Sequence, residues 1–159
     1  MNTMNNEILQ QITRLLDWSA KKVGIHLTER GAVYFEEREI WWVSLGENVG
    51  SEANGKNFHY ERPVVILRKF SADMFLAVPC TTKTKNGSWY HPFLIDKEER
   101  RAVMSQMRTI SSRRLIRKLG NMTPGDFVAL QDSVIGLIKT NPPTVLSEGP
   151  RIPLRGQCK

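Results

Sequence analysis

The sequence predicts a mainly β fold with helices, in which a small β-barrel is preceded by one helix and followed by another. Three observations support this prediction. Short stretches rich in β-branched and aromatic residues recur between Gly-, Pro- and Asn-containing turns through the middle of the chain. An amphipathic helical pattern precedes them, and a well-capped helical pattern follows them. The length of 159 residues suits one compact domain with short appendages.

The first expected element is an amphipathic helix over Glu7–Val23, which Gly24 is expected to end. Its apolar residues follow helical spacing. They are Ile8, Leu9, Ile12, Leu15, Leu16 and Val23. We expect this apolar face to pack on the main domain; the alternative is that the helix serves as a lid or as a docking helix for a partner.

Six strands are expected between the helices, because these segments are β-branched, aromatic or apolar and are bounded by turn residues. They cover Glu39–Leu45, Pro63–Leu67, Phe75–Pro79, His91–Ile95, Ala102–Met104 and Arg108–Ile110. Pro63 is acceptable only at the first position of its strand, since proline cannot donate to a sheet. The loop Lys83–Trp89 carries an Asn-Gly turn signal and exposed lysines.

The last element is a helix over Pro124–Lys139, with Thr123 as its cap and proline at the first helical position. Its expected packed side comprises Phe127, Leu130, Val134, Leu137 and Ile138. The Pro- and Gly-punctuated remainder is expected to be flexible. Three parts result: an N-terminal helical extension (1–30), a β-barrel domain (31–140) and a C-terminal tail (141–159).

The chain is basic, with a formal net charge of +7. This favours an anionic partner such as RNA, DNA, an acidic protein or an anionic membrane, although a solvated basic surface would give the same count. No stretch approaches the roughly 18–20 apolar residues of a membrane span, and the start lacks the pattern of a signal peptide. Cys80 lies in an apolar run and Cys158 in the tail, which argues against a disulfide framework. We expect a cytoplasmic protein without membrane association.

Several kinds of catalytic centre lack support in the sequence. His26, His59 and His91 lie far apart and beside no cysteine pair, so no zinc site is expected. The sequence contains no phosphate-binding glycine loop and no serine in a glycine elbow. We therefore expect no metal and no cofactor, and any chemistry must come from Arg, Thr, Ser, Glu or Lys.

Four segments, in order, resemble the MazF/PemK family of bacterial toxins over about residues 38–138. They are EIWWVSL (39–45); GSE (50–52), followed by RPVVIL (62–67); VPCTT (78–82); and SQMRTI (105–110), followed by RL (114–115) and KLG (118–120). None of these segments is specific alone. Their common order, with a helix at the end, makes a chance similarity improbable.

The resemblance implies an SH3-like β-barrel of the MazF/PemK/CcdB type with a C-terminal helix, to which this chain adds an N-terminal helix. It also implies a homodimer and an endoribonuclease that cleaves single-stranded RNA without metal, leaving a 2′,3′-cyclic phosphate and a 5′-OH. The implied partners are single-stranded RNA and a cognate acidic antitoxin. Operator DNA is a further implied partner of the toxin–antitoxin complex.

The resemblance also indicates catalytic residues. Arg62 matches the catalytic arginine of the family, and its planar guanidinium suits a phosphate whose charge grows in the transition state. Thr81 matches the family's active-site threonine and could donate to the phosphate or to the leaving oxygen. Glu52 is the best available carboxylate to accept the 2′-OH proton, with loop anchoring as its alternative role.

Further residues are expected to bind substrate. Ser51 lies in the family's substrate-facing loop, Thr82 ends the third matching segment, and the cationic and aromatic candidates could contact phosphates or unpaired bases. They are Lys56, Lys83, Lys85, Arg108, Trp89, Tyr90 and Phe93. For each lysine, a solvated loop charge is an equally good interpretation.

The chain departs from the family pattern at several positions. Some members carry an Arg and an Asp where this chain has Val103 and Ser105, and some carry a histidine at Ser51. The loop from Gly50 to Arg62 is longer than usual. Two alternatives to a ribonuclease also stay open. One is a non-catalytic nucleic-acid- or protein-binding module, such as a gyrase poison or an operator-binding protein; the other is a decayed toxin whose N-terminal helix covers the RNA groove.

Overall fold

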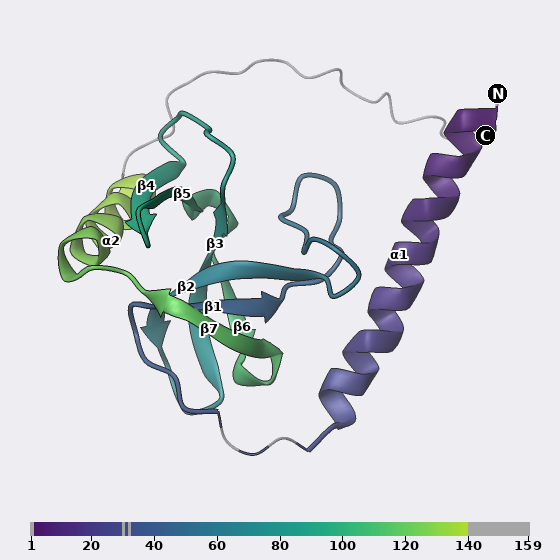
Figure 1. Ribbon diagram of the computed structural model, residues 1–159, viewed down its shortest axis with the longest axis horizontal. Coiled ribbons are helices and arrows are strands. Elements are labelled where there is room, and N and C mark those ends of the chain that lie inside the picture. The colour runs from purple at the N-terminus through teal and green to yellow at the C-terminus, as the bar shows by residue number, and fades with distance from the viewer. Residues whose placement is uncertain (1, 30, 32, 140–159) are drawn as a thin grey trace, which may run out of the picture.

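The computed structural model describes residues 2–29, 31 and 33–139, so the predicted tail (141–159) lies outside the described residues. A seven-stranded antiparallel sheet curves into a barrel, with one helix on each side (Figure 1). The elements are α1 (Asn2–Leu27), β1 (Glu39–Ser44), β2 (Glu61–Lys69), β3 (Met74–Thr81), β4 (Tyr90–Ile95), β5 (Glu98–Val103), β6 (Arg108–Ser111), β7 (Leu115–Asn121) and α2 (Pro124–Lys139). Single-turn helices η1 (Met104–Gln106) and η2 (Ser112–Arg114) flank β6. The predicted fold class, a small barrel with a C-terminal and an extra N-terminal helix, is confirmed.

The sheet folds over because β3 pairs with different strands along its length. The strand order is β4-β5-β3-β2-β1-β7, and β6 also pairs with β3. Met74–Ala77 of β3 pair with β6, whereas Cys80 and Thr81 pair with β5. The end of β3 at Thr81 therefore lies where two parts of the sheet meet.

Two apolar clusters hold the barrel together. One lies between the sheet and α2 and includes Ile40, Val78 and Leu130. The other lies on the opposite side of the sheet, where Phe35 and Phe75 pack with ring centroids 5.0 Å apart. Because the central strands contribute to both clusters, they are apolar runs without alternation.

The strand boundaries differ most from the predicted ones in β2 and β5. The strand β2 begins at Glu61, so Pro63 is its third residue and not its first. The pairing of β2 with β3 starts only at Val64, so Pro63 interrupts no hydrogen bond to β3. Asp96 and Lys97 both have positive φ values, of 48° and 68°, and form the two-residue turn that joins β4 to β5. This turn lacks the usual Asn-Gly or Asp-Gly pair, so no turn signal in the sequence marks the early start of β5.

The strand β7 was not predicted. Its residues Arg117 and Lys118 are charged and exposed, and only Leu115 of the strand is fully buried. The strand pairs with β1 at an edge of the sheet. An exposed edge strand does not need to alternate apolar and polar residues. The residue pattern therefore did not predict β7.

The helix α2 has the predicted bounds and cap, since Thr123 Oγ1 accepts a hydrogen bond from the N–H of Asp126 (3.1 Å). Leu130 and Val134 are buried as expected. Ile138, however, is 70% exposed, so its assignment to the packed side was wrong. It lies about 80° around the helix from Leu130, beyond the contact with the sheet.

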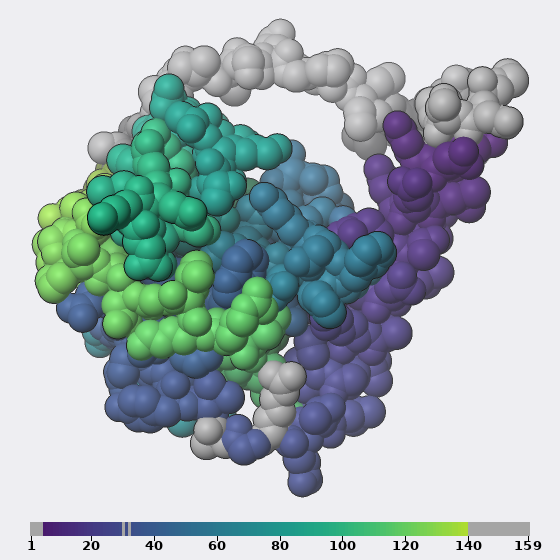
Figure 2. Space-filling model, in the orientation of Figure 1, coloured from purple at the N-terminus to yellow at the C-terminus, as the bar shows by residue number. Residues whose placement is uncertain are grey.

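The helix α1 is longer than predicted, because Gly24 does not end it. It lies beside the barrel (Figures 1 and 2) but uses an unexpected face, on which Trp18 is the buried anchor. The apolar residues of the predicted packing face, Ile8, Leu9, Ile12, Leu15, Leu16 and Val23, are between 43% and 65% exposed. The expectation that this face packs on the barrel was therefore wrong. No helix in the described part of the chain is long and apolar enough to cross a membrane.

Candidate functional site

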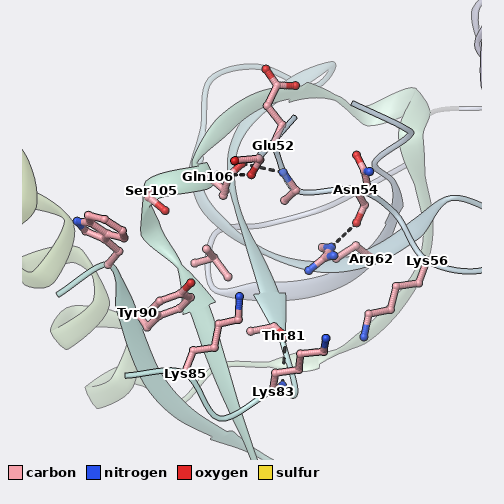
Figure 3. A pocket seen from close by; sticks show the side chains of 14 residues that line it. Glu52, Asn54, Lys56, Arg62, Thr81, Lys83, Lys85, Tyr90, Ser105 and Gln106 are labelled. Carbon is pink, nitrogen blue, oxygen red and sulfur yellow. Dashed lines mark hydrogen bonds between the residues drawn. The ribbon is translucent and has the colours of Figure 1, made fainter. Parts of the chain in front are cut away.

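A cavity of about 450 Å³ opens where β2, β3 and β5 meet η1 and the loop that follows β1 (Figure 3). Nine of the twelve residues predicted for the site line it: Ser51, Glu52, Lys56, Arg62, Thr81, Lys83, Lys85, Trp89 and Tyr90. These residues span 40 positions in sequence, from 51 to 90. The pairing of β2 with β1 and β3 brings them to one place.

Three predicted residues lie outside the lining of this cavity: Phe93, which is buried in the core, Thr82 and Arg108. Thr82 is exposed beside the cavity. Arg108 lies on β6 and donates a hydrogen bond through Nη1 to Asn48 Oδ1 (3.3 Å), so it contacts the loop behind the cavity. The roles of Thr82 and Arg108 in substrate binding stay predictions.

The guanidinium of Arg62 is held by two backbone carbonyls. Its Nε donates to the carbonyl of Asn54 (2.6 Å), and its Nη1 donates to the carbonyl of Cys80 (3.4 Å). Partial burial lowers the pKa of Arg62, but an arginine so placed stays protonated at neutral pH. The contacts fix the plane of the guanidinium and leave Nη2 for an anion in the cavity.

Thr81 ends β3 and is 8% exposed. Its Oγ1 accepts a hydrogen bond from the backbone N–H of Lys83 (3.2 Å). That bond uses a lone pair and leaves the hydroxyl proton for donation. Burial raises the pKa of the neighbouring Cys80 thiol to about 12, so Cys80 stays neutral and is not a nucleophile.

Glu52 lies at the rim of the cavity. Its Oε2 accepts a hydrogen bond from the backbone N–H of Val49 (3.3 Å). Figure 3 shows the carboxylate turned away from Arg62 and Thr81. In this arrangement Glu52 anchors its loop, and a role in accepting the 2′-OH proton requires the side chain to rotate.

Two lining residues that the sequence did not single out are Gln106 and Asn54. Gln106, on η1, accepts from the N–H of Ala53 (2.8 Å) and donates to the carbonyl of Ser51 (3.3 Å), so it clamps the loop. The fourth family-like segment contains Gln106 and was the available signal. Asn54 contacts Arg62 through its backbone carbonyl. Because every residue has this group, no sequence pattern could have indicated the contact.

The cavity is electropositive. Lys56, Lys83 and Lys85 accompany Arg62 in its lining, against the single carboxylate of Glu52. Such a charge balance favours a polyanion.

Two aromatic residues, Trp89 and Tyr90, also line the cavity. Trp89 is 52% exposed, and the Lys85 ammonium lies 5.8 Å from the centroid of the Tyr90 ring. Phe93, which was expected to offer a stacking face, is instead buried in the core. Two aromatic faces therefore remain for unpaired bases.

Metal-binding side chains do not gather in the described structure. Within residues 2–29, 31 and 33–139, no three His, Cys, Asp or Glu side chains come together in a way that could hold a metal ion. His91, one of the three histidines, instead contacts Ser133 of α2.

Two of three comparisons with known proteins give matches. A family model described as "PemK-like, MazF-like toxin of type II toxin-antitoxin system" matches residues 36–138. Among curated protein sequences, no match is found. The solved structure of MazF from Deinococcus radiodurans has a TM-score of 0.54 at 13% identity, covering 68% of this chain and 99% of that one. An endoribonuclease in complex with its cognate antitoxin, from a mycobacterial species, has a TM-score of 0.52 at 14% identity, covering 69% and 100%. At such identities the two structures show a shared fold.

Proposed function

Because this chain belongs to the PemK-like, MazF-like toxins of type II toxin–antitoxin systems, we propose that it is an endoribonuclease that cleaves single-stranded RNA without a metal ion. The observation that supports this most directly is the convergence of Arg62 and Thr81 on one electropositive cavity. A protein that only binds its partner needs neither residue in particular.

The proposed reaction uses the RNA's own nucleophile. The 2′-oxygen attacks the adjacent phosphorus and loses its proton, and the bond from phosphorus to the 5′-oxygen breaks. The products are a 2′,3′-cyclic phosphate and a 5′-OH, for which the leaving oxygen must gain a proton. No external nucleophile enters this step, so the protein has to supply proton transfer and charge stabilisation.

Arg62 is proposed to bind the non-bridging phosphate oxygens. Its plane is already fixed by the carbonyls of Asn54 and Cys80, so little reorganisation is needed when charge develops on the phosphate. Thr81 is proposed to donate its hydroxyl proton in a hydrogen bond to the phosphate or the leaving oxygen. Glu52 remains the proposed acceptor of the 2′-OH proton, subject to rotation from its contact with Val49.

The substrate is proposed to lie along the lysines and aromatic rings of the cavity. Lys56 and Lys83 would contact phosphates, while Trp89 would stack on an unpaired base. Ser51 lies in the loop that Gln106 clamps, where its backbone is held near the substrate. Stacking without base-edge contacts discriminates weakly, so the loop 50–61 is the proposed source of sequence selectivity.

The proposed partners follow from the family and from one relative. The mycobacterial endoribonuclease was solved with its cognate antitoxin, and we extend this to an acidic antitoxin for this basic chain. A homodimer, binding of operator DNA by the toxin–antitoxin complex, and a cytoplasmic location belong to the same proposal. So does the division into a helical extension (1–30) and a toxin domain (31–140).

We expect the purified protein to cut a mixed-sequence single-stranded RNA in EDTA at discrete positions, with cyclic-phosphate ends. Replacing Arg62→Ala should reduce the cleavage rate at least about 100-fold, as the loss of one oxyanion-stabilising group typically does. Thr81→Val should have a similar effect, since it removes the hydroxyl and nearly preserves the volume. The rates are measured by gel electrophoresis of end-labelled RNA.

A matched control for Arg62→Ala is Arg68→Ala. Arg68 lies on the same strand but is exposed and pairs with Glu37, outside the cavity lining. Glu52→Gln in the same assay separates proton transfer from loop anchoring, because the amide oxygen can still accept from Val49. Intact RNA with folded wild-type protein free of antitoxin would favour the binding-module alternative instead.

A further inference from the structure

The helix α1 lies outside the region that the family model matches, yet it contacts the loop that forms one wall of the cavity. The guanidinium of Arg14 reaches Glu47 Oε2 with Nε at 2.8 Å and with Nη2 at 2.6 Å. The Glu47 side chain is only 14% exposed, so this ion pair is shielded from solvent on one side. Because Glu47 begins the loop, the contact connects α1 to the site.

The contact continues from Glu47 to the candidate catalytic arginine. Glu47 Oε1 accepts a hydrogen bond from Asn54 Nδ2 (2.7 Å), and Asn54 Oδ1 accepts one from the N–H of Asn48 (2.6 Å). Both polar atoms of the Asn54 side-chain amide, Nδ2 and Oδ1, are thus hydrogen-bonded. The carbonyl of Asn54 then accepts from Arg62 Nε (2.6 Å).

We infer that Arg14 is a positioning residue of this site, acting through Glu47 and Asn54 to orient the guanidinium of Arg62. The inference rests on the proposed function, because it concerns the geometry of the proposed phosphate-binding arginine. It makes α1 part of the catalytic apparatus of this chain instead of a lid. In the described structure no α1 residue lines the cavity.

The physical argument concerns the Asn54 carbonyl. The Arg62 guanidinium has a shorter bond to this carbonyl than to that of Cys80 (2.6 Å against 3.4 Å). In the loop that carries Asn54, Ala53 packs against an apolar cluster, and hydrogen bonds of Asn48, Asn54 and Gln106 hold the backbone around it. A displacement of about 1 Å in a reacting geometry can cost up to 100-fold in rate.

Helix α1 is docked by groups other than the Arg14 side chain. Trp18 is buried against Tyr60, with ring centroids 5.6 Å apart, and Tyr60 Oη donates to the backbone carbonyl of Arg14 (3.1 Å). Both contacts survive replacement of the Arg14 side chain. Such a variant therefore tests positioning, since the helix stays in place.

The test compares Arg14→Ala, Arg14→Lys and Glu47→Gln in the full-length chain. We expect Arg14→Ala to lower kcat for RNA cleavage about tenfold with KM within twofold, because ground-state contacts to the RNA are unchanged. Arg14→Lys, which can restore one bond to Glu47, should recover most of the rate. The double variant Arg14→Ala/Glu47→Gln should be no slower than the slower single variant, since both changes break the same connection.

The matched control is Lys21→Ala. Lys21 lies on the same helix, and its Nζ lies 5.9 Å from the centroid of the Tyr60 ring, which the Arg14 guanidinium also approaches, at 4.9 Å. Unlike Arg14, Lys21 bonds to the carbonyl of His59 and not to Glu47. The Lys21→Ala variant should cleave RNA at a rate within twofold of the wild-type rate. A readout independent of activity is amide hydrogen exchange at Asn48, Ala53 and Gly55, which Arg14→Ala should accelerate and Lys21→Ala should not.

The outcomes separate this inference from the proposed function. If the wild type cleaves RNA, Arg62→Ala does not, and Arg14→Ala behaves like Lys21→Ala in both rate and exchange, the positioning role is wrong. If the wild type itself is inactive, the proposed function fails, and the exchange measurement still decides whether Arg14 orders the loop.

Discussion

His91 shows how the environment of a single side chain sets a measurable property of the fold. It lies on β4, and its Nδ1 is 3.0 Å from Ser133 Oγ on α2. Ser133 Oγ also donates to the carbonyl of Ala129 (2.8 Å), so it accepts from His91, and Nδ1 carries the proton. Burial lowers the pKa of His91, while the nearby charge of Asp126 on α2 raises it by a smaller amount. The histidine is therefore a structural contact between sheet and helix.

This pKa shift predicts a pH dependence of stability. Because the folded-state pKa lies below the ordinary value near 6.5, the unfolded chain binds more protons between the two values. The contribution of neutral His91 is thus present above about pH 6.5 and is lost as the pH falls through the folded-state pKa. Urea unfolding between pH 5 and 7 should show stability falling toward acid for the wild type and a flatter profile for His91→Gln. Identical slopes for the two proteins would contradict the assignment.

At the scale of elements, the docking of α1 depends on one close approach. Gly46 has a φ of +103°, and a Cβ there would lie 2.3 Å from the ring of Trp18. The Arg114 guanidinium covers the same ring from the barrel side, 5.4 Å from its centroid. Helix α1, whose apolar face stays exposed, is therefore held on the barrel by Trp18 and by several polar contacts.

We expect Gly46→Ala to weaken the docking of α1, because it forces the Trp18 ring to move and adds backbone strain. The expected loss is about 1–3 kcal/mol in the free energy of unfolding, together with faster proteolysis of residues 2–27. Gly24→Ala, within α1 itself, is the control: its Cβ would meet nothing within 4 Å. That change should stabilise the protein by up to about 1 kcal/mol through helix propensity. Equal proteolysis of the two variants would argue that Gly46 is not required.

For the whole molecule, the chain has a net positive charge, and some of its positive side chains gather at the candidate site. The net charge of +7 is spread over the chain, but three lysines and one arginine line the candidate site. Binding of single-stranded RNA there would displace counterions from the phosphates that these groups contact. The homodimer proposed from the family would add a second copy of the same cations to the assembly.

The salt dependence of RNA affinity distinguishes binding through the cavity's cations from binding through the net charge of the whole protein. In an Arg62→Ala background that prevents cleavage, replacing Lys56, Lys83 and Lys85 by Gln should reduce the slope of log affinity against log salt by up to about 2. The control replaces Arg68, Lys97 and Lys139 by Gln, which removes the same charge outside the cavity lining. It should change the slope much less. Equal effects of the two triple variants would show that RNA binds through general surface charge.

The sequence determined the local features and the family. Turn chemistry and β-branched runs indicated most of the strands, the Thr-Pro-Gly-Asp start identified α2 with its observed bounds, and ordered segments indicated the toxin fold. Arg62 and Thr81 could be singled out because they stand in those segments. These features are encoded within a few residues of one another, so a pattern in one chain can carry them.

The tertiary structure decided which surfaces and distant groups meet. Helical periodicity showed that α1 has an apolar face, but only the shape of the barrel placed Trp18 in the contact and left that face exposed. The edge strand β7 has no alternation of its own and depends on β1 for its pairing. The contacts from Arg14 on α1 to Arg62 on β2 run through the Glu47 carboxylate and through the side-chain amide and backbone carbonyl of Asn54, in the loop between β1 and β2. Their convergence depends on strand order and loop path, which no local pattern contains.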